Sequence, residues 1–193
     1  MGCGPPALGS RNHEFHIDAA VDGDSDQERL TTVLYTLLED SLVGRLLLAG
    51  TAEHLKYVAF DKGSTQKRES FPLTSWERSE KPFRETIRQL KAYFAGKLTA
   101  FDLDLAGDGT EFQQRVWQEL RNVPYGETVS YGEIAKAIGQ PTASRAVGMA
   151  NGRNPISIVV PCHRIIGSSG KLVGYGGGID RKTRLLQLEG VTV

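Results

Sequence analysis

The stretch Asn154–Arg164, which reads NPISIVVPCHR, decides how this chain is interpreted. Its β-branched run, Ile156–Val160, is typical of a buried strand. Proline has no N–H to donate to a neighbouring strand, so we expect Pro161 to end the pairing and turn the chain outward. Cys162 is then expected where a buried scaffold meets an opening, with an imidazole and a guanidinium in the next two residues.

The thiol of Cys162 is the candidate reactive group. A free thiol has a pKa of roughly 8.5, so only a few per cent is thiolate at neutral pH unless a base or a positive charge helps. His163 and Arg164 could both supply that help. The alternative is a buried and inert cysteine, because free cysteine is among the most buried residue types.

Length and charge bound the class of protein. The chain has 193 residues, enough for one large domain or two small ones. Lys+Arg and Asp+Glu both total 23. The charges are sorted, since residues 111–193 carry 10 basic and 6 acidic side chains, a net of +4, and residues 1–110 carry 13 and 17, a net of −4. The second half is therefore the likelier face for a polyanion, although +4 is also ordinary for solubility.

Several classes are excluded by composition. Two cysteines, Cys3 and Cys162, do not make a disulfide framework, which indicates a reducing compartment. No apolar stretch approaches the ~18 residues of a membrane span, and the first residues lack a secretory signal. We expect a cytoplasmic protein, or a nuclear one in a eukaryote, with no membrane partner. Cys3, His13, His16 and His54 have no metal-ligand spacing, so we expect no metal and no cofactor.

The first half has the pattern of a small sheet and a helix. Residues 1–29 are poor in large apolar side chains and are expected to be a disordered tail. Three antiparallel strands are predicted at Thr31–Leu38, Leu42–Leu48 and Leu55–Phe60. A helix is predicted from Pro82 to near Gly96. The polar, glycine-rich residues 106–109 form a joint, which divides the chain into domains at 30–108 and 109–193.

The second half begins with helices. Thr110 precedes one helix, and Ser130 with Glu133 forms a capping box that opens another, ended by Gly139. Thr142 is expected to cap a third helix over residues 143–151. We expect the side chains on its inward face to be Ala146, Val147 and Ala150. Helix, short turn and helix is the pattern of a helix-turn-helix, but it also occurs in many all-helical packings.

Asn154, the apolar run, the Pro161–Arg164 core and the later Gly174–Gly177 resemble the O6-alkylguanine-DNA alkyltransferases, from about Leu30 to Gly190. The resemblance implies an α+β fold, with a small N-terminal antiparallel sheet-plus-helix domain followed by a mainly helical, winged-helix-like C-terminal domain. It also implies irreversible, stoichiometric transfer of an alkyl group from O6-alkylguanine to Cys162, with O4-alkylthymine as a second candidate substrate. The implied partner is double-stranded DNA, bound in the minor groove by a monomer that flips the damaged base out of the stack.

The resemblance also assigns roles around the thiol. His163 corresponds to the histidine that takes the thiol proton through a water molecule, and Glu189 to the carboxylate that orients the imidazole. Asn154 matches a hinge asparagine that braces the turn. Tyr131 matches a tyrosine that pushes the 3′ phosphate and donates a proton toward guanine N3. Without the resemblance, Glu189 would be interpreted as a solvated side chain and Tyr131 as packing.

Further residues are assigned to DNA and to the flipped base. Arg145 matches the arginine that fills the vacated stack, although it could also be a phosphate clamp or a surface residue. The other expected DNA contacts are Thr142, Ala143, Ser144, Ala146, Gly148 and Ala150. The expected contacts to the base are Tyr131, Met149, Val173, Gly174, Tyr175, Gly176 and Gly177. The family often has serine or alanine where Gly176 stands, so a contact to the guanine edge is in question.

Two rival functions remain open. A non-catalytic protein that recognises alkylation damage would need the same DNA-binding face, but retention of Cys162 argues against it. A thiol hydrolase or transferase for small molecules would need only Cys162 and His163. Arg145 in the second helix of a helix-turn-helix has no use in that chemistry.

Overall fold

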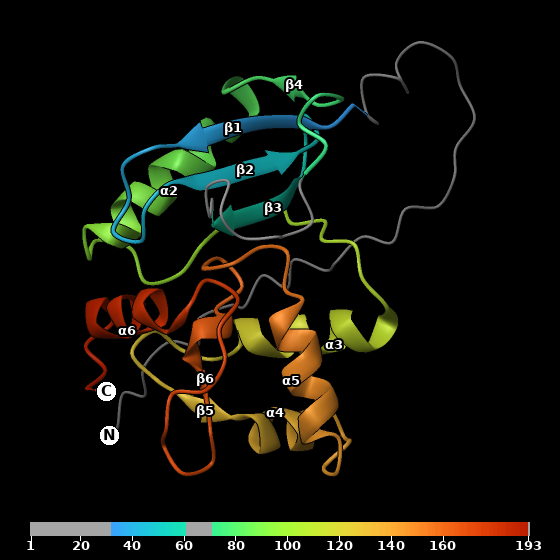
Figure 1. Ribbon diagram of the computed structural model, residues 1–193, viewed down its shortest axis with the longest axis vertical. Coiled ribbons are helices and arrows are strands. Elements are labelled where there is room, and N and C mark those ends of the chain that lie inside the picture. Colours follow the sequence, from blue (N-terminus) through green and yellow to red (C-terminus); the bar gives the residue numbers. More distant parts are fainter. Residues whose placement is uncertain (1–31, 61–70, 193) are drawn as a thin grey trace, which may run out of the picture.

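The computed structural model describes residues 32–60 and 71–192, so the predicted tail and Thr31 lie outside the described residues. Within these two ranges, no helix is both long and apolar enough to cross a bilayer. A sheet with one helix across it occupies one end of the molecule, and the remaining helices occupy the other (Figure 1). This is the predicted α+β arrangement.

The sheet has the order β3-β2-β1-β4. Strands β1 (Leu34–Leu38), β2 (Leu46–Gly50) and β3 (Leu55–Phe60) are antiparallel, as predicted, and β4 (Glu77–Arg78) adds a short parallel edge. The second strand begins later than predicted, because the chain first turns between Ser41 and Gly44, where the N–H of Gly44 donates to the Ser41 carbonyl at 3.0 Å. Gly44 has a φ of 86°, which glycine adopts without a steric penalty.

Helix α2 (Arg84–Phe94) follows the short 3-10 helix η2 (Lys81–Phe83) and packs along the sheet (Figure 1). Its buried side chains include Leu90 and Tyr93. The predicted helix and its end near Gly96, which has a φ of 68°, agree with this element.

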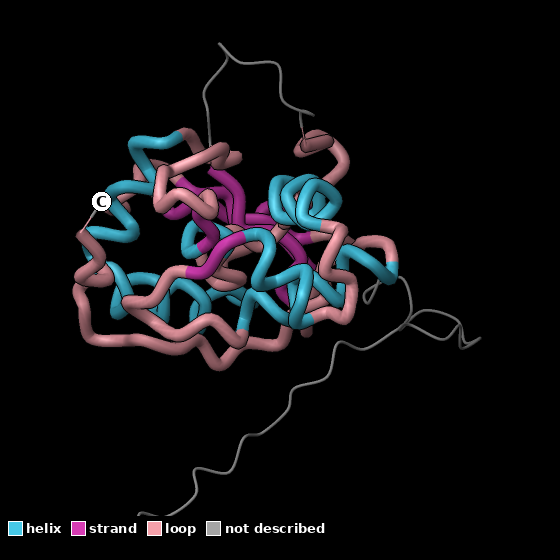
Figure 2. The backbone as a smooth tube through the Cα atoms, turned by 90° about the horizontal axis from the view of Figure 1, so that it is seen from below, coloured by secondary structure: helices cyan, strands magenta, loops and turns pink. Residues whose placement is uncertain are grey.

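The C-terminal domain contains three helices that pack against one another, α3 (Glu111–Arg121), α4 (Tyr131–Ala137) and α5 (Ser144–Gly152). The remaining elements are β5 (Val129–Ser130), η3 (Cys162–Arg164), β6 (Ile165–Ile166) and α6 (Ile179–Leu188). Strands β5 and β6 pair in parallel. Seen from below, strands lie near the middle of the described chain with helices around them (Figure 2).

The helix ends test the capping predictions. The capping box of Ser130 and Glu133 is present, and Thr110 caps α3 in the same way. The prediction for Thr142 is wrong, because the N-cap residue of α5 is Ala143, which makes no side-chain cap. A turn in which the Ala143 N–H donates to the Gln140 carbonyl places Thr142 one residue too early.

The predicted strand at residues 156–160 is wrong. Only isolated bridges form there, and one of them pairs Ile156 with Val58 of β3. The run instead folds back on itself, since the Val160 N–H donates to the Ile156 carbonyl at 3.0 Å. Ile158 sits at the centre of this turn with a φ of 76°, a strained conformation for a β-branched residue. Its side chain is fully buried, so apolar packing holds the turn that local preference disfavours.

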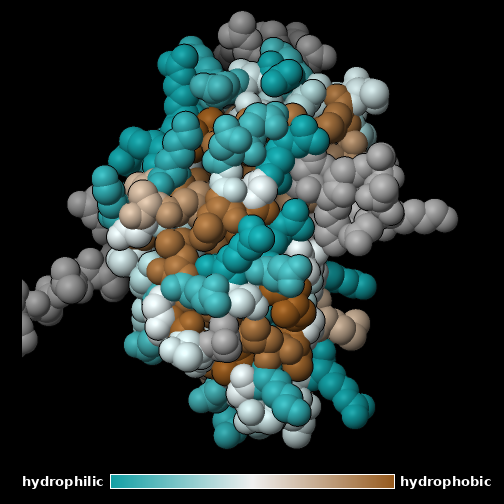
Figure 3. All heavy atoms as spheres, turned by 60° about the vertical axis from the view of Figure 1, so that its left-hand side comes forward, coloured by the Kyte–Doolittle hydropathy of each residue, from teal (hydrophilic) through white to brown (hydrophobic). Residues whose placement is uncertain are grey.

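The two domains are joined along β3. The Val58 N–H donates to the Pro155 carbonyl, and the Ser157 N–H donates to the Val58 carbonyl, both at 3.0 Å. Buried apolar side chains form one cluster that runs from the sheet into the helices. Apolar side chains also emerge between polar ones across the middle of the face seen in Figure 3. Residues of η3 therefore lie within reach of both domains.

Candidate active site

Cys162 begins η3, and its side chain is only 4% exposed. The Asn154 amide donates to its sulfur at 3.1 Å. Burial raises the pKa of the thiol, while the hydrogen bond from Asn154 and the positive charge of Lys182 act in the opposite direction. The thiol is therefore neutral at rest, and a base is needed to release its proton.

Asn154 holds the turn that presents Cys162. Its Nδ2 donates to the Val160 carbonyl at 2.8 Å as well as to the sulfur, and its Oδ1 accepts from the Ile156 N–H at 3.0 Å. One side chain thus ties together the start of the turn, its end and the thiol. This geometry matches the bracing role expected for Asn154.

His163 is fully buried, and its Nε2 lies 2.9 Å from Oε1 of Glu189. A carboxylate only accepts hydrogen bonds, so Nε2 carries the ring proton and Nδ1 keeps the lone pair. Nδ1 makes no hydrogen bond to any described residue. Burial lowers the pKa of His163, which keeps the imidazole neutral and able to take a proton.

Glu189 is buried among hydrogen-bond donors. Arg164 donates from Nε to Oε2 and from Nη2 to Oε1, both at 2.9 Å. Burial raises the pKa of Glu189, but the hydrogen bonds from His163 and Arg164 outweigh it and hold the pKa at about 2. Glu189 is therefore an ionised, fixed carboxylate, and its interpretation as a solvated residue is wrong.

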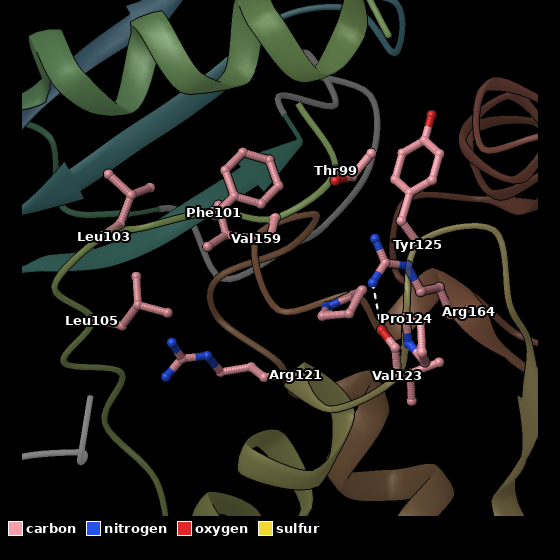
Figure 4. Close-up of a pocket in the computed structure, with 12 residues that line it drawn as sticks. Thr99, Phe101, Leu103, Leu105, Arg121, Val123, Pro124, Tyr125, Val159 and Arg164 are labelled. Carbon is pink, nitrogen blue, oxygen red and sulfur yellow. Dashed lines mark hydrogen bonds between the residues drawn. The ribbon is translucent and has the colours of Figure 1, made fainter. Parts of the chain in front are cut away.

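Its position next to Cys162 and His163 suggested that Arg164 helps to ionise the thiol, but its guanidinium binds elsewhere. Its guanidinium contacts Glu189, and its Nη1 donates to the Val123 carbonyl at 2.6 Å (Figure 4). It forms one wall of a cavity of about 330 Å³ at the junction of the domains, which Cys162 does not line. The group that lowers the pKa of the thiol by its charge is Lys182.

Lys182 was not predicted from the sequence. It lies on α6 with a fully buried side chain, and its Nζ donates to the carbonyls of Ile165 and Val173. Burial lowers its pKa to about 8. An ammonium group is thereby held beside Cys162 by backbone carbonyls on both sides.

The glycine-rich loop lies against the N-terminal domain. The Tyr175 ring meets the Phe60 ring edge-on at 5.6 Å. A Cβ on Gly177 would lie 2.7 Å from Phe60 and 2.8 Å from Tyr175, so only glycine fits there. Val173 is 39% exposed, and Gly174 has a φ of 22°. Burial raises the pKa of Tyr175, and the charge of Cys162 raises it further.

The helix-turn-helix forms a separate, open surface. A hollow of about 450 Å³ is lined by Tyr131, Ser144, Arg145 and Gly148, with four further residues: Ser130, Gly132, Gly167 and Ser168. Arg145 is exposed, and Met149 on the same helix is 63% exposed. Burial raises the pKa of Tyr131, and the charge of Cys162 adds to this effect.

Other expected DNA contacts divide into exposed and buried residues. Thr142, Ala143 and Ser144 precede or begin α5 and are at least partly exposed. Ala146 is exposed, so its expected inward packing is wrong. Ala150 is 2% exposed and packs in the core, where it cannot contact DNA. Gly176 is partly buried within its loop.

Sequence reasoning also missed Tyr93. This residue lies on α2, 96 positions from Glu189 in the chain, yet its hydroxyl donates to Glu189 Oε1 at 2.6 Å. One signal was available, because Tyr93 follows Leu90 by three residues and shares its apolar helix face. A buried tyrosine hydroxyl needs a partner, although the sequence does not say which one.

Both halves of the chain match families of known proteins. Residues 33–106 match the family model described as 6-O-methylguanine DNA methyltransferase, ribonuclease-like domain. Residues 111–191 match the model described as 6-O-methylguanine DNA methyltransferase, DNA binding domain. A methylated-DNA–protein-cysteine methyltransferase of Methanosarcina acetivorans is 58% identical over 157 residues, which cover 81% of this chain and 99% of that protein.

Solved structures agree with the sequence matches. The Mycobacterium tuberculosis O6-methylguanine methyltransferase superimposes with a TM-score of 0.74 at 52% identity, covering 82% of this chain and 93% of that one. A crystal structure of Mycobacterium tuberculosis OGT in complex with DNA has a TM-score of 0.72 at 52% identity, covering 81% and 92%.

Proposed function

The chain belongs to the 6-O-methylguanine DNA methyltransferase family. We propose that the sulfur of Cys162 is the nucleophile that accepts the alkyl group. The protein is a methylated-DNA–protein-cysteine methyltransferase, which repairs DNA by direct reversal. It takes the alkyl group of O6-alkylguanine onto its own cysteine, and each molecule reacts once. Its partner is DNA.

The reaction is a displacement at carbon. The sulfur of Cys162 attacks the alkyl carbon, so a C–S bond forms as the C–O6 bond breaks and its electron pair passes to the guanine. The thiol proton passes to His163 through a water molecule, and the guanine takes up one proton at N3 from the Tyr131 hydroxyl and leaves as the neutral base. Exchange with solvent then returns the proton held by His163 to Tyr131. A thioether and an intact guanine are the products, and no other reactant is consumed.

Two hydrogen-bonded pairs that meet at consecutive residues support this assignment: Asn154 donates to the sulfur of Cys162, and Glu189 holds the imidazole of the next residue, His163. Asn154 positions the sulfur, and its amide stabilises the thiolate as it forms. His163 has a free lone pair on Nδ1 because Glu189 holds the opposite nitrogen. Lys182 adds a positive charge that favours the thiolate.

DNA recognition is assigned to the surface formed by α4 and α5. We infer that Arg145 enters the space left by the flipped base, because its side chain is exposed at the rim of the hollow that Tyr131 also lines. Met149, which is exposed on the same helix, is assigned to the flipped guanine. The glycine loop, with Tyr175, is assigned to the flipped guanine.

Further proposals concern the whole molecule. The domain boundary near residues 106–109 and a tail at 1–29 stay predictions, as does a monomeric state. A cytoplasmic location is likewise proposed from composition. O4-alkylthymine is proposed as a second substrate, because the same displacement at an alkyl carbon applies to it.

The test is the mass of the intact protein after reaction. The full chain is mixed with an excess of duplex that carries one O6-methylguanine, and Cys162→Ala is treated in parallel. We expect one methyl adduct, mapped to Cys162 and absent from the variant. Binding without an adduct would instead indicate a damage-recognition protein, and an adduct on another residue would overturn the assignment of Cys162.

A further inference from the structure

Tyr93 brings the N-terminal domain into the hydrogen-bonded network of the active site. Its side chain is fully buried, and its hydroxyl donates to Glu189 Oε1 at 2.6 Å. The same hydroxyl lies 3.4 Å from Nε2 of His163. A phenol has one proton to donate, and the shorter distance to a charged acceptor assigns that proton to Glu189.

We propose that Tyr93 is a positioning residue for alkyl transfer, whose hydroxyl fixes Glu189 and thereby the imidazole of His163. The proposal rests on the proposed function, in which Glu189 orients His163 as the base for Cys162. It adds that the N-terminal domain supplies part of the machinery of a reaction whose nucleophile lies in the C-terminal domain.

The donors around Glu189 show what Tyr93 contributes. Oε1 accepts from Tyr93, from His163 and from Arg164, and Oε2 accepts from Arg164 and from the Gly126 N–H at 3.3 Å. Among these donors from the described residues, Tyr93 alone belongs to the N-terminal domain. It shares Oε1 with His163, so the position of that oxygen, and the direction of the hydrogen bond to the imidazole, depend on the phenol.

The ring of Tyr93 is held independently of its hydroxyl. It packs against Phe94, Phe101 and Tyr125, with ring centroids 5.5, 5.2 and 6.0 Å away. A phenylalanine at this position would keep these contacts. Tyr93→Phe therefore removes the hydrogen bond to Glu189 and leaves the packing in place.

The Tyr93 hydroxyl also affects the pKa of His163, because it changes the charge on the Glu189 carboxylate. Burial lowers the pKa of His163, and the Glu189 carboxylate opposes this effect. The hydrogen bond from Tyr93 withdraws charge from Oε1, so its loss makes the carboxylate a stronger partner and raises the pKa of His163. The other titratable or charged groups that face this pair are Arg164, Lys182, Cys162, Tyr125 and Tyr175. Tyr93→Phe leaves all of them unchanged.

This predicts a specific change in the pH profile. His163 must be neutral to take the thiol proton, so the rate falls as the pH drops through its pKa. In Tyr93→Phe this acid limb moves to higher pH. A merely structural role would lower the folded fraction without moving the limb.

The experiment follows alkyl transfer from free O6-benzylguanine to the full-length protein between about pH 5 and pH 9. Tyr125→Phe is the matched control, because its hydroxyl donates to the Leu188 carbonyl at 2.9 Å and not to a carboxylate. Rates are divided by the folded fraction measured by circular dichroism. We expect Tyr93→Phe to lose about tenfold at pH 6 and about threefold at pH 8, while Tyr125→Phe keeps the wild-type limb.

Two further variants separate this proposal from the proposed function. If Tyr93→Phe keeps the wild-type profile while Glu189→Gln and His163→Gln are slow, the role of Tyr93 is overturned and the roles of Glu189 and His163 stand. A loss that is uniform in pH, or an equal shift in Tyr125→Phe, would also overturn it. If Glu189→Gln and His163→Gln both react at the wild-type rate, His163 is not the base and the proposal for Tyr93 is overturned with it, whereas a wild-type protein that takes no benzyl group onto Cys162 would contradict the proposed function itself.

Discussion

Replacing Glu189 by glutamine should destabilise the protein in a way that depends on pH. Glu189 has its pKa lowered from 4.5 to about 2, with burial opposing the shift and the hydrogen bonds from His163 and Arg164 causing it. A difference of about 2.5 pKa units corresponds to about 3 kcal/mol of folding free energy. Glutamine cannot ionise, and it leaves the buried guanidinium of Arg164 without its charge partner.

The pH dependence follows from the direction of the shift. A carboxyl group with a lowered pKa stabilises the folded state fully above its unfolded pKa, and this contribution disappears as the pH falls toward the folded pKa. The wild type should therefore be more stable than Glu189→Gln by about 3 kcal/mol at pH 7, and the difference should shrink between about pH 5 and pH 2.

Urea unfolding at several pH values measures this difference. With a slope of about 2 kcal/mol per molar, the midpoint at pH 7 should fall by about 1.5 M in Glu189→Gln. Glu127→Gln is the control, because it makes the same substitution at an exposed carboxylate. A difference below about 1 kcal/mol at pH 7, or one of the same size at pH 3, would refute the assignment of Glu189 as a buried, ionised carboxylate.

Two further predictions concern DNA and the glycine loop. Arg145→Ala should slow repair of duplex DNA by about tenfold or more and change the reaction with free O6-benzylguanine by less than about twofold, since a free base needs no flipping; equal losses on both substrates would contradict that role. Gly177→Ala should cost about 1 to 3 kcal/mol in thermal unfolding and slow the reaction with O6-benzylguanine, because its Cβ would lie 2.7 Å from Phe60 and 2.8 Å from Tyr175. Gly152→Ala, where an added Cβ meets nothing within 4 Å, should leave both readouts near wild type, and similar effects in the two variants would rule out the steric explanation.

Short-range signals in the sequence predicted most of the elements. The capping box of Ser130 and Glu133 specifies the start of α4, because both of its hydrogen bonds join residues three apart. The short apolar run Leu55–Phe60 likewise predicts a strand, and its last three residues are all buried. The resemblance carried by the Pro161–Arg164 core gave the family, which the comparisons confirm.

The same reasoning failed where packing outweighs local preference. Residues 156–160 have the composition of a strand, but their pairing with β3 and the hydrogen bonds of Asn154 bend them into a buried turn. Local backbone preference correctly disfavours a positive φ at Ile158, but burial of its side chain in the core offsets that cost. No pattern within the run itself indicates this outcome.

The sequence by itself determined that a cysteine, a histidine and a glutamate of an alkyltransferase are present, because that information lies in residue types and their spacing. Only the tertiary structure decided that Arg164 serves Glu189, that Lys182 is buried beside the thiol and that Tyr93 reaches the carboxylate from the other domain. These contacts join residues between 20 and 96 positions apart, as from Cys162 to Lys182 and from Tyr93 to Glu189. Such distant partners are selected by tertiary packing, within the C-terminal domain for Arg164 and Lys182 and between the two domains for Tyr93, and local sequence preferences carry no information about that packing.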